Sequence, residues 1–366
     1  MNVKQLVDAM EEIAPTCNAE SWDNVGLLVG DPGQRLSKAM LTIDYTPAVA
    51  VEAREAACDA IIAYHPPLFE ATKRVTSGGS TELIFDAICR GVAIYSPHTA
   101  LDVARGGTND MLADALMLVE TLPLKLASPK AKQYKLVTFL PASALEKVSK
   151  ALFDAGAGRI GNYTQCSFRS PGQGTFFGEE GTNPAAGRAG KLEVSEELRI
   201  ETILPIDKVE TVVAALKKTH PYEEPAFDLL TLAAPPEGLG IGRIGKIPGE
   251  ATAEMLINHL KRELELGYVL VAGDAQKMVK RAAVCAGACG NLLDDAIAAK
   301  ADLYITGEMR HHEALKAVRA GVTIVCTLHS NSERAVLKRL ASKLKELLPD
   351  LLTSVSLMDR DPFVVT

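Results

Sequence analysis

Strand-like and helix-like segments alternate in two separate stretches of this chain, which is the feature that most restricts its fold. The first stretch contains three short apolar segments typical of strands: Met40–Tyr45, Asp59–Tyr64 and Val92–Tyr95. Helix-like segments follow each of them: Ala48–Cys58, Thr81–Arg90 and Asn109–Leu118. Strands that alternate with helices predict a parallel sheet covered on its faces, so the fold class is α/β.

The same order returns near the end of the chain. Strands are expected at Arg281–Ala286, Asp302–Thr306 and Val322–Thr327. Helices are expected at Asn291–Lys300, His311–Ala320 and, as one long helix, Ser332–Leu347. The shared plan predicts two pseudo-repeated α/β lobes, residues 1–130 and 235–366, that form one core.

Residues 131–234 between the lobes show a different repeat. Two strand–helix pairs, Tyr134–Pro141 with Ser143–Ala155 and Arg199–Pro205 with Val209–Thr219, flank a Gly-rich hairpin that has an excursion at Gly178–Gly190. A final strand is expected at Ala226–Leu232. This β-α-β-β-α-β order predicts an inserted ferredoxin-like α+β domain. The Pro-bearing segments Ala127–Lys132 and Ala233–Gly238 are its predicted linkers.

Composition excludes several classes of protein. The chain has 366 residues, a formal net charge of −7 and a sequence pI of about 5.6, which argues against non-specific nucleic-acid binding. Its first helix carries acids and does not resemble a signal peptide, and the sequence has no run of 18 apolar residues that could span a membrane. The seven cysteines form no framework, although Cys285 and Cys289 lie four residues apart. We therefore expect reduced, buried thiols and a cytoplasmic location.

A histidine follows the strand at Asp59–Tyr64. Pro66 and Pro67 cannot continue a strand, so the strand should end with His65 at its tip. Ligands of α/β proteins gather beyond the carboxyl ends of the strands. His65 is therefore a candidate metal ligand or acid–base group.

Two further histidines follow strands at matching places in the two lobes. His98 precedes Asp102 by four residues, and His329 precedes Glu333 by four. On a helical turn, residues i and i+4 point the same way, so each imidazole and carboxylate could bind one ion. The alternatives are caps or core hydrogen bonds for the histidines, and helix-dipole acids for Asp102 and Glu333.

These five residues form a mixed imidazole and carboxylate set, which suits Zn, Mn, Fe or Ni. A carboxylate can bridge two ions, and two ions roughly 3.5–4 Å apart can lower the pKa of a water held between them. Glu308 is a candidate general acid or base, a partner for a ligating imidazole, or a solvated acid at a helix start. His312 is a second candidate for handling protons. The motif His220-Pro221-Tyr222-Glu223-Glu224-Pro225 is either a binding loop or a rigid turn.

The chain resembles the dinuclear-metal-centre family of GTP cyclohydrolase 1 type 2 homologues, also known as NGG-interacting-factor-like proteins. The matching motifs are W-D-N-V-G-L-L-V-G at 22–30, Y-H-P-P-L-F at 64–69, S-P-H-T-A-L-D at 96–102, T-G-E-M-R-H-H at 306–312 and H-S-N-S-E at 329–333, together with H-P-Y-E-E-P at 220–225. The resemblance covers essentially the whole chain. It implies a toroidal homohexamer, a central P-II-like insert, and two divalent ions per subunit, with zinc favoured over Mn, Fe or Ni.

Carried over by position, the ligands implied by this resemblance are His65, Asp102, His329 and a bridging Glu333. The chain departs from many bacterial members at Tyr64, where they have a second histidine. A phenol with a pKa of about 10 is a poor zinc ligand at neutral pH. Either the first ion is bound more weakly, or His98 supplies the missing nitrogen.

Two functions are open from the sequence. The first is a metal-dependent hydrolase that acts on a nucleotide-like small molecule, in the manner of a GTP cyclohydrolase, with Glu308 or His312 handling protons. The second is a non-catalytic, metal-binding regulatory hexamer whose P-II-like insert binds a ligand or a partner. A third, DNA binding through a ring-shaped channel, agrees poorly with the acidic charge balance.

Overall fold

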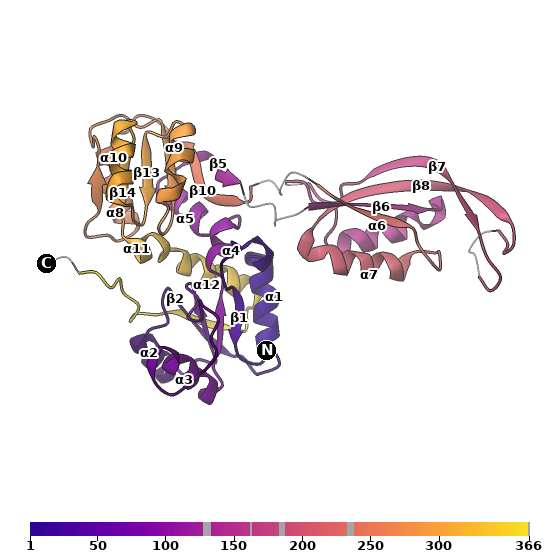
Figure 1. Ribbon diagram of the computed structural model, residues 1–366, viewed down its shortest axis with the longest axis horizontal. Helices are drawn as coiled ribbons and strands as arrows, with labels where there is room; N and C mark the ends of the chain where they lie inside the picture. The colour runs from indigo at the N-terminus through magenta and orange to yellow at the C-terminus, as the bar shows by residue number, and fades with distance from the viewer. Residues whose placement is uncertain (127–132, 162, 183–186, 233–237, 365–366) are drawn as a thin grey trace. The chain divides into compact units, whose positions relative to one another are not determined.

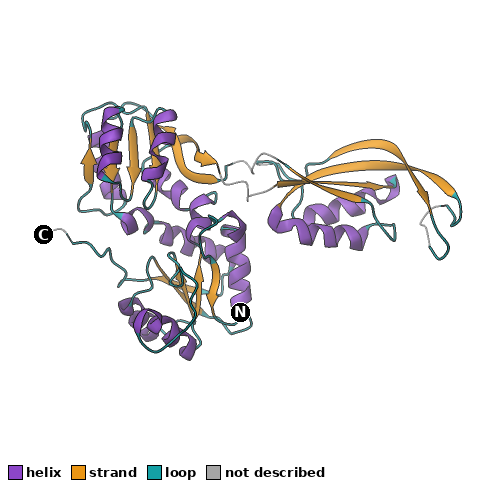
Figure 2. Ribbon diagram, viewed as in Figure 1, coloured by secondary structure: helices purple, strands orange, loops and turns teal. Residues whose placement is uncertain are grey.

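The computed structural model describes residues 1–126, 133–161, 163–182, 187–232 and 238–364. The chain divides into two compact units. One unit joins Met1–Ala127 to Gly238–Thr366, and the other is Ser128–Glu237. Figure 1 labels the elements of both, and Figure 2 shows that each combines helices with at least one sheet.

A five-stranded sheet organises the N-terminal part of the first unit. Its order is β1 (Gly26–Val29), β4 (Ala93–Ser96), β3 (Ala60–Ala63), β2 (Lys38–Thr42) and β15 (Leu352–Val355). Strand β1 runs antiparallel to β4, and the other pairings are parallel. The helices of this part are α1 (Val3–Ile13), α2 (Pro47–Glu55), α3 (Glu82–Arg90), α4 (His98–Val103) and α5 (Thr108–Ala115). Strands β3 and β4 are buried along their whole length, as expected of central parallel strands.

A six-stranded sheet organises the rest of the first unit. Its order is β11 (Leu270–Ala272), β14 (Thr323–Cys326), β13 (Leu303–Thr306), β12 (Arg281–Cys285), β10 (Gly240–Lys246) and β5 (Val119–Leu126). The helices are α8 (Ala253–Glu263), α9 (Leu293–Ala298), α10 (His311–Arg319), α11 (His329–Glu333) and α12 (Val336–Leu347). Strands β12, β13 and β14 are parallel, while β11, β10 and β5 pair antiparallel to their neighbours.

The two sheets share an order and a core. Strands β11-β14-β13-β12 repeat the order and directions of β1-β4-β3-β2. One hydrophobic cluster contains residues of both sheets, for example Leu41 and Val284, together with Leu337 and Leu340 of α12. Burial of this apolar surface against a common helix stabilises both sheets together. Three histidines follow the carboxyl ends of parallel strands in these sheets: His65 follows β3, His98 follows β4 and His329 follows β14.

The prediction of one long helix at Ser332–Leu347 is wrong in its extent. Helix α11 begins earlier and ends at Glu333, and α12 starts at Val336 after a turn at Arg334 and Ala335. Arg334 bonds to the carboxylate of Asp359 at 2.6 Å and to its carbonyl oxygen at 2.9 Å. The residues around Arg334 do not indicate a partner so far along the chain, so the turn at Arg334 and Ala335 could not be predicted from the sequence.

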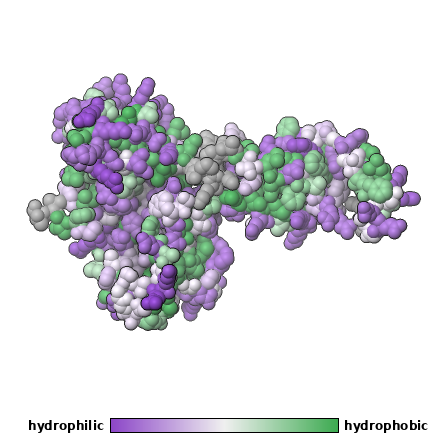
Figure 3. Space-filling model, in the orientation of Figure 1, coloured by the Kyte–Doolittle hydropathy of each residue, from purple (hydrophilic) through white to green (hydrophobic). Residues whose placement is uncertain are grey.

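The second unit is a four-stranded antiparallel sheet with two helices. The strand order is β7 (Phe168–Phe177), β8 (Leu192–Pro205), β6 (Gln133–Leu140) and β9 (Phe227–Thr231). Helices α6 (Leu145–Asp154) and α7 (Val209–Thr219) pack on one face of the sheet (Figures 1 and 2), where they bury Leu136, Leu140 and Ile200. Exposed apolar side chains gather instead at the far end of the β7–β8 hairpin, where Figure 3 is green; they include Phe177, Leu192 and Val194.

Short 3₁₀ turns occur at Thr16–Asn18, Gly79–Thr81, Ala142–Ala144, Ile206–Lys208 and Gly290–Leu292. Within the described ranges, no helix has both the length and the hydropathy needed to cross a membrane.

Candidate metal centre

Three predicted ligands from distant parts of the sequence meet at one point. His65, His329 and Glu333 each offer one ligand atom, and these atoms lie within 4.8 Å of one another. Glu333 faces both imidazoles: its Oε2 lies 3.3 Å from Nε2 of His65, and its Oε1 lies 3.4 Å from Nε2 of His329. Its side chain is only 3 % exposed. A buried carboxylate between two imidazoles is an arrangement that suits a divalent transition metal.

Sharp turns after two strands aim two of the histidines. His98 is the first residue of α4 and has a φ of +23°, and Leu328, just before α11, has a φ of +72°. Non-glycine residues rarely adopt positive φ, because the Cβ atom crowds the backbone. Such backbone strain persists where the surrounding structure fixes it, and it is found often at functional sites.

Each of the three histidines bonds a carboxylate through Nδ1. His65 pairs with Asp44 at 3.0 Å, His98 with Asp23 at 2.8 Å, and His329 with Glu308 at 2.9 Å. With Nδ1–H donating to the carboxylate, Nε2 keeps its lone pair. Metal-binding histidines in proteins are held in this way, because the acid fixes the tautomer and makes the ligating nitrogen more basic.

Two of these acid partners, Asp44 and Asp23, remain carboxylates at neutral pH. The hydrogen bond with His65 is the largest of the effects that hold the pKa of Asp44 below its usual range. Burial alone would raise the pKa of Asp23, but bonds with His98 and Thr99 outweigh burial and lower it. Neither residue was singled out from the sequence. The signal for Asp44 is its place just beyond β2, at the same sheet edge as His65, whereas no local pattern links Asp23 to His98, which lies 75 residues away.

Asp102 lies beside the triad and has a tyrosine partner. Its side chain accepts a hydrogen bond from the hydroxyl of Tyr64, which also lies 3.1 Å from Oγ1 of Thr108. Burial, with a smaller contribution from the negative charge of Glu333, raises the pKa of Asp102 to about 6. Burial also raises the pKa of Tyr64 far above its usual value. Tyr64 therefore stays a neutral phenol that donates to Asp102, and its phenolate is not available as a ligand.

Aromatic rings line one side of this group. The ring of His65 lies 5.3 Å, between centroids, from that of His98 and from that of His329. Trp22 lies 6.0 Å from His98 and 6.0 Å from Phe69, and both Trp22 and Phe69 are more than half exposed. The site therefore combines a polar centre with an accessible apolar edge.

Unsatisfied atoms show that the site fits a cation. Nε2 of His65 and Oε2 of Glu333 are buried, and neither forms a hydrogen bond with any residue that the structure describes. Buried polar atoms almost always have a partner. Burial alone would lower the pKa of His65, but the carboxylates of Asp44 and Glu333 raise it to about 10, so in the metal-free protein Nε2 holds a proton that a bound cation would displace. A divalent cation supplies the positive charge of that proton and satisfies both atoms.

A glycine leaves room beside the carboxylate. Gly287 follows β12 with a φ of +74°, and a Cβ atom at this position would come within 2.9 Å of Oε1 of Glu333. Its N–H donates to the hydroxyl of Ser332 at 2.8 Å. Any larger residue would strain the turn and press on Glu333.

The remaining predicted residues lie as follows. His98 and Asp102 adjoin the triad but are outside the set of three that meets within 4.8 Å. Glu308 lies against Nδ1 of His329, which corresponds to the interpretation as an imidazole partner. His312 is exposed near the start of α10, where its ring lies 5.3 Å from that of His311.

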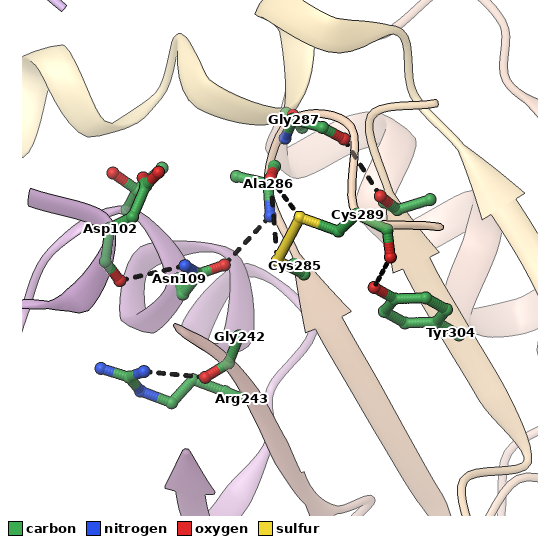
Figure 4. Close-up of a disulfide and its surroundings, with 12 residues drawn as sticks. Asp102, Asn109, Gly242, Arg243, Cys285, Ala286, Gly287, Cys289 and Tyr304 are labelled. Atoms are coloured by element: carbon green, nitrogen blue, oxygen red, sulfur yellow. Dashed lines mark hydrogen bonds between the residues drawn. A yellow bond between two sulfur atoms is a disulfide. The ribbon is translucent and has the colours of Figure 1, made fainter. Parts of the chain in front are cut away.

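The expectation of reduced, buried thiols is confirmed for Cys58 and Cys326, which are free and buried, and is wrong for other cysteines. Cys285, the last residue of β12, forms a disulfide with Cys289, because the intervening turn brings their Cα atoms to 6.0 Å (Figure 4). Cys89 is exposed, and Cys17 and Cys166 are half-buried. The spacing of four residues gave no indication of a disulfide, since it depends on the shape of the turn that contains Gly287.

A family model covers residues 1–362 of the chain: Duf34/NIF3, NGG1p interacting factor 3. The chain therefore belongs to the NIF3 family, and the family resemblance drawn from its motifs is confirmed. Its relatives include proteins named GTP cyclohydrolase 1 type 2 homolog. The one from Halalkalibacterium halodurans is 37 % identical over 352 residues, which are 95 % of this chain and 94 % of that protein. The one from Bacillus subtilis is 35 % identical over 368 residues, 99 % of this chain and 98 % of that protein.

Solved structures agree with this membership. A Bacillus cereus protein related to NIF3 superposes with a TM-score of 0.89 at 34 % identity, covering 100 % of this chain and 99 % of that one. A Staphylococcus aureus protein superposes with a TM-score of 0.77 at 26 % identity and covers the same shares. The mixed α/β fold of this chain is thus that of NIF3-related proteins.

Proposed function

We propose that this protein holds a dinuclear divalent-metal centre and is a metal-dependent hydrolase of a nucleotide-like small molecule. The observation that carries the proposal is that His65 and His329 meet at the buried carboxylate of Glu333, with one polar atom of His65 and one of Glu333 unsatisfied. The names of the relatives, GTP cyclohydrolase 1 type 2 homolog, point to the same class of chemistry.

The donor atoms suggest how the ligands are shared. Glu333 turns a different oxygen toward each imidazole, as a bridging carboxylate would. Asp102 and His98 adjoin this group and complete the proposed ligand set. Bound divalent ions, zinc foremost and Mn, Fe or Ni as alternatives, supply Lewis acidity and activate water.

The protein's own residues have three tasks in this proposal. Asp44, Asp23 and Glu308 hold the imidazoles in one tautomer and one orientation. Trp22 and Phe69 offer exposed aromatic surface beside His98, which suits the flat base of a nucleotide. Glu308 is half exposed, so we assign it the transfer of protons to or from a substrate. His312 is a second candidate for this role.

We propose a specific assembly for the chain as well. The repeated strand order of the two sheets supports two pseudo-repeated lobes, and the β-α-β-β-α-β order of the second unit supports a P-II-like insert. The resemblance to the family adds a toroidal homohexamer, and we propose separately that the protein is cytoplasmic. Sedimentation of the purified protein at several concentrations tests the hexamer, and a monomer at all of them would contradict it.

Hydrolysis by the metal-loaded protein tests the main proposal. Metal-free protein is loaded with Zn or Mn and incubated with GTP, a panel of phosphoesters and cyclic amides, beside a Glu333→Ala variant. We expect the metal-loaded parent protein to turn over at least one of these substrates and the Glu333→Ala variant to lose this activity. Metal binding without any turnover that depends on Glu333 would instead favour the second candidate, a non-catalytic regulatory assembly.

Counting ions tests the role of His98. If His98 supplies the nitrogen that Tyr64 cannot, metal-saturated protein contains two ions per subunit, and a His98→Ala variant contains one. Elemental analysis after gel filtration measures both. One ion per subunit in the parent protein, unchanged in the variant, would contradict this role.

A further inference from the structure

A cavity of about 700 Å³ opens on the second unit, and none of the proposed metal ligands lines it. Phe139 of β6, Arg199 of β8 and Ser170 of β7 stand opposite one another in the sheet register and line it. Neighbours such as Leu140 and Ile200 point into the core under α6 and α7. Because side chains alternate along a strand, the cavity lies on the face that these helices do not cover.

The floor of the cavity is open at Gly172, where the neighbouring residues on β7 are small. Ser170, Gly172 and Gly174 occupy alternate positions on β7, and Phe139 and Phe176 stand at either side of them. A Cβ atom built on Gly172 meets no atom within 4 Å, whereas one built on Gly174 would clash with the carboxylate of Glu197, which lies over that glycine. Ligand sites for small molecules are typically about 300–1,000 Å³ and combine apolar walls with a few polar groups, so the size and the lining both fit.

A rigid loop after α7 forms another wall. His220 is 8 % exposed; its Nε2 bonds the carbonyl oxygen of Phe139 at 3.0 Å, and its Nδ1 accepts from the N–H of Tyr222 at 3.1 Å. Burial lowers the pKa of His220, which keeps the imidazole neutral and able to accept. The hydroxyl of Tyr222 donates to Glu197 at 2.6 Å. The loop is therefore fixed to the sheet at both ends of the His220–Tyr222 turn.

The charges around the cavity are unbalanced. Even with Glu223 left out of the count, Glu197 and Glu224 outnumber the one cation among the described lining residues, Arg199. The guanidinium of Arg199 is already engaged, because its Nε donates to Glu201 at 2.8 Å and it lies 5.9 Å from the ring centroid of Phe139. The cavity thus presents net negative charge beside aromatic walls, a combination that attracts organic cations.

We propose that this cavity is a binding site for a small organic cation that carries a flat apolar group. The flat group lies over Gly172 beside Phe139, and the cationic group is directed toward Glu197, whose carboxylate lies over Gly174. This inference concerns the second unit alone and holds whether or not the metal centre is catalytic.

Three probes that differ almost only in charge test the proposal on the full-length protein. Benzamidine is a cation, benzamide is neutral and benzoate is an anion, and all carry the same flat ring. Titrations followed by NMR chemical shifts give a dissociation constant for each. We expect benzamidine to bind at least about tenfold more tightly than benzamide, and benzoate not to bind, since a charge-assisted hydrogen bond is much stronger than a neutral one. Equal binding of the three, or no binding of benzamidine, would overturn the proposal.

Two variants locate the binding. Gly172→Leu fills open space in the cavity, while Lys218→Leu adds the same side chain on exposed α7, on the helix-covered side of the sheet. Glu197→Gln removes one charge, and Glu180→Gln removes an exposed charge that does not line the cavity. Benzamidine binding should be abolished by Gly172→Leu, fall about tenfold in Glu197→Gln and stay unchanged in the two controls.

The state of assembly separates this proposal from a protein contact. If a second copy of the chain covered the cavity, Gly172→Leu would lower the sedimentation coefficient, and benzamidine would shift no signal of the cavity residues. That result would overturn the proposal. Unchanged sedimentation of Gly172→Leu, with benzamidine binding lost, would support it, and thermal unfolding of each variant shows that the fold is retained.

Discussion

At the scale of single residues, the candidate centre depends on carboxylates that bind the histidines and are not themselves proposed as metal ligands. Asp44, Asp23 and Glu308 each take the Nδ1 of one imidazole, so the three Nε2 atoms are left for ligation. An imidazole without such a partner can change tautomer and rotate, and both changes cost binding free energy. These acids should therefore control metal affinity although they are not ligands.

Removal of the Asp44 carboxylate should weaken metal binding. Substitution Asp44→Ala leaves His65 free to rotate, and we expect the dissociation constant for Zn to rise about 10- to 100-fold. Asp44→Asn, which can still accept from Nδ1–H, should have a smaller effect. Competition with a chelator of known affinity measures both, and Asp8→Asn, an exposed acid on α1, is the control. An unchanged affinity in Asp44→Ala would show that the pair has no role in the site.

The hydroxyl of Tyr64 should stabilise the metal-free protein in a pH-dependent way. The pKa of Asp102 is about 6 in the fold, above the value of about 3.9 for an unfolded chain, so protonation of Asp102 favours the folded state. The free-energy cost of burying the ionised Asp102 carboxylate is absent below pH 4, where the group is protonated, and is present in full above pH 6. Tyr64→Phe removes a donor to the charged form, and so should lower the free energy of unfolding by about 1–3 kcal/mol at pH 7.5 and by less at pH 4.5.

Urea unfolding at the two pH values measures this difference. Tyr163→Phe removes a hydroxyl from a side chain that is 76 % exposed and serves as the matched control. A loss in Tyr64→Phe that is the same at both pH values would mean that the hydroxyl supports packing and not the Asp102 carboxylate.

At the scale of elements, local patterns predicted the central strands well. Strand β3 lies within the expected Asp59–Tyr64, and α3 within the expected Thr81–Arg90, because burial on both faces and a clear amphipathic stripe leave strong signals. Strands β5 and β10 were missed. Strand β5 is largely exposed and β10 carries three glycines, so neither has the alternation or the β-branched composition of a typical strand.

The candidate site was predictable where ligand chemistry repeats, and not where it depends on distant contacts. His65, His329 and Glu333 were found because each stands at or just after a strand end in a motif. The bond of Tyr64 to Asp102 spans 38 residues and that of Asp23 to His98 spans 75, and no local pattern records such pairings.

The turn after β12 should matter to metal binding although it contains none of the proposed ligands. Gly287→Ala would place a Cβ atom within 2.9 Å of Oε1 of Glu333, whereas Gly321→Ala, also at a positive φ of +77°, meets no atom within 4 Å. Both variants should lose about 1–2 kcal/mol of stability from backbone strain. Only Gly287→Ala should also lose metal affinity, by tenfold or more. Calorimetric titration with Zn measures this, and equal affinities in the two variants would contradict it.

At the scale of the whole molecule, the second unit is inserted into the chain of the first between two paired strands, β5 and β10. Strands β5 and β10 pair antiparallel, and Leu126 stands opposite Gly240 in their register. Antiparallel partners that face each other in this way can be joined by a two-residue turn. The ladder between β5 and β10, and the six-stranded sheet that contains it, thus need no residue between these two positions.

Excision of residues 127–239 should leave a folded protein that still binds metal. An Asn-Gly turn that joins Leu126 to Gly240 fits a type I′ hairpin and shortens the loop to be closed, so the remaining unit should lose no stability from closing it. Because His65, Asp102, His329 and Glu333 all belong to that unit, the Zn dissociation constant should stay within about threefold of the parent value, a difference of under 1 kcal/mol. Benzamidine binding should disappear completely. A shortened protein that folds, as judged by cooperative unfolding, yet binds Zn tenfold more weakly would show that the second unit contributes to the centre, and the independence of the two sites would have to be abandoned.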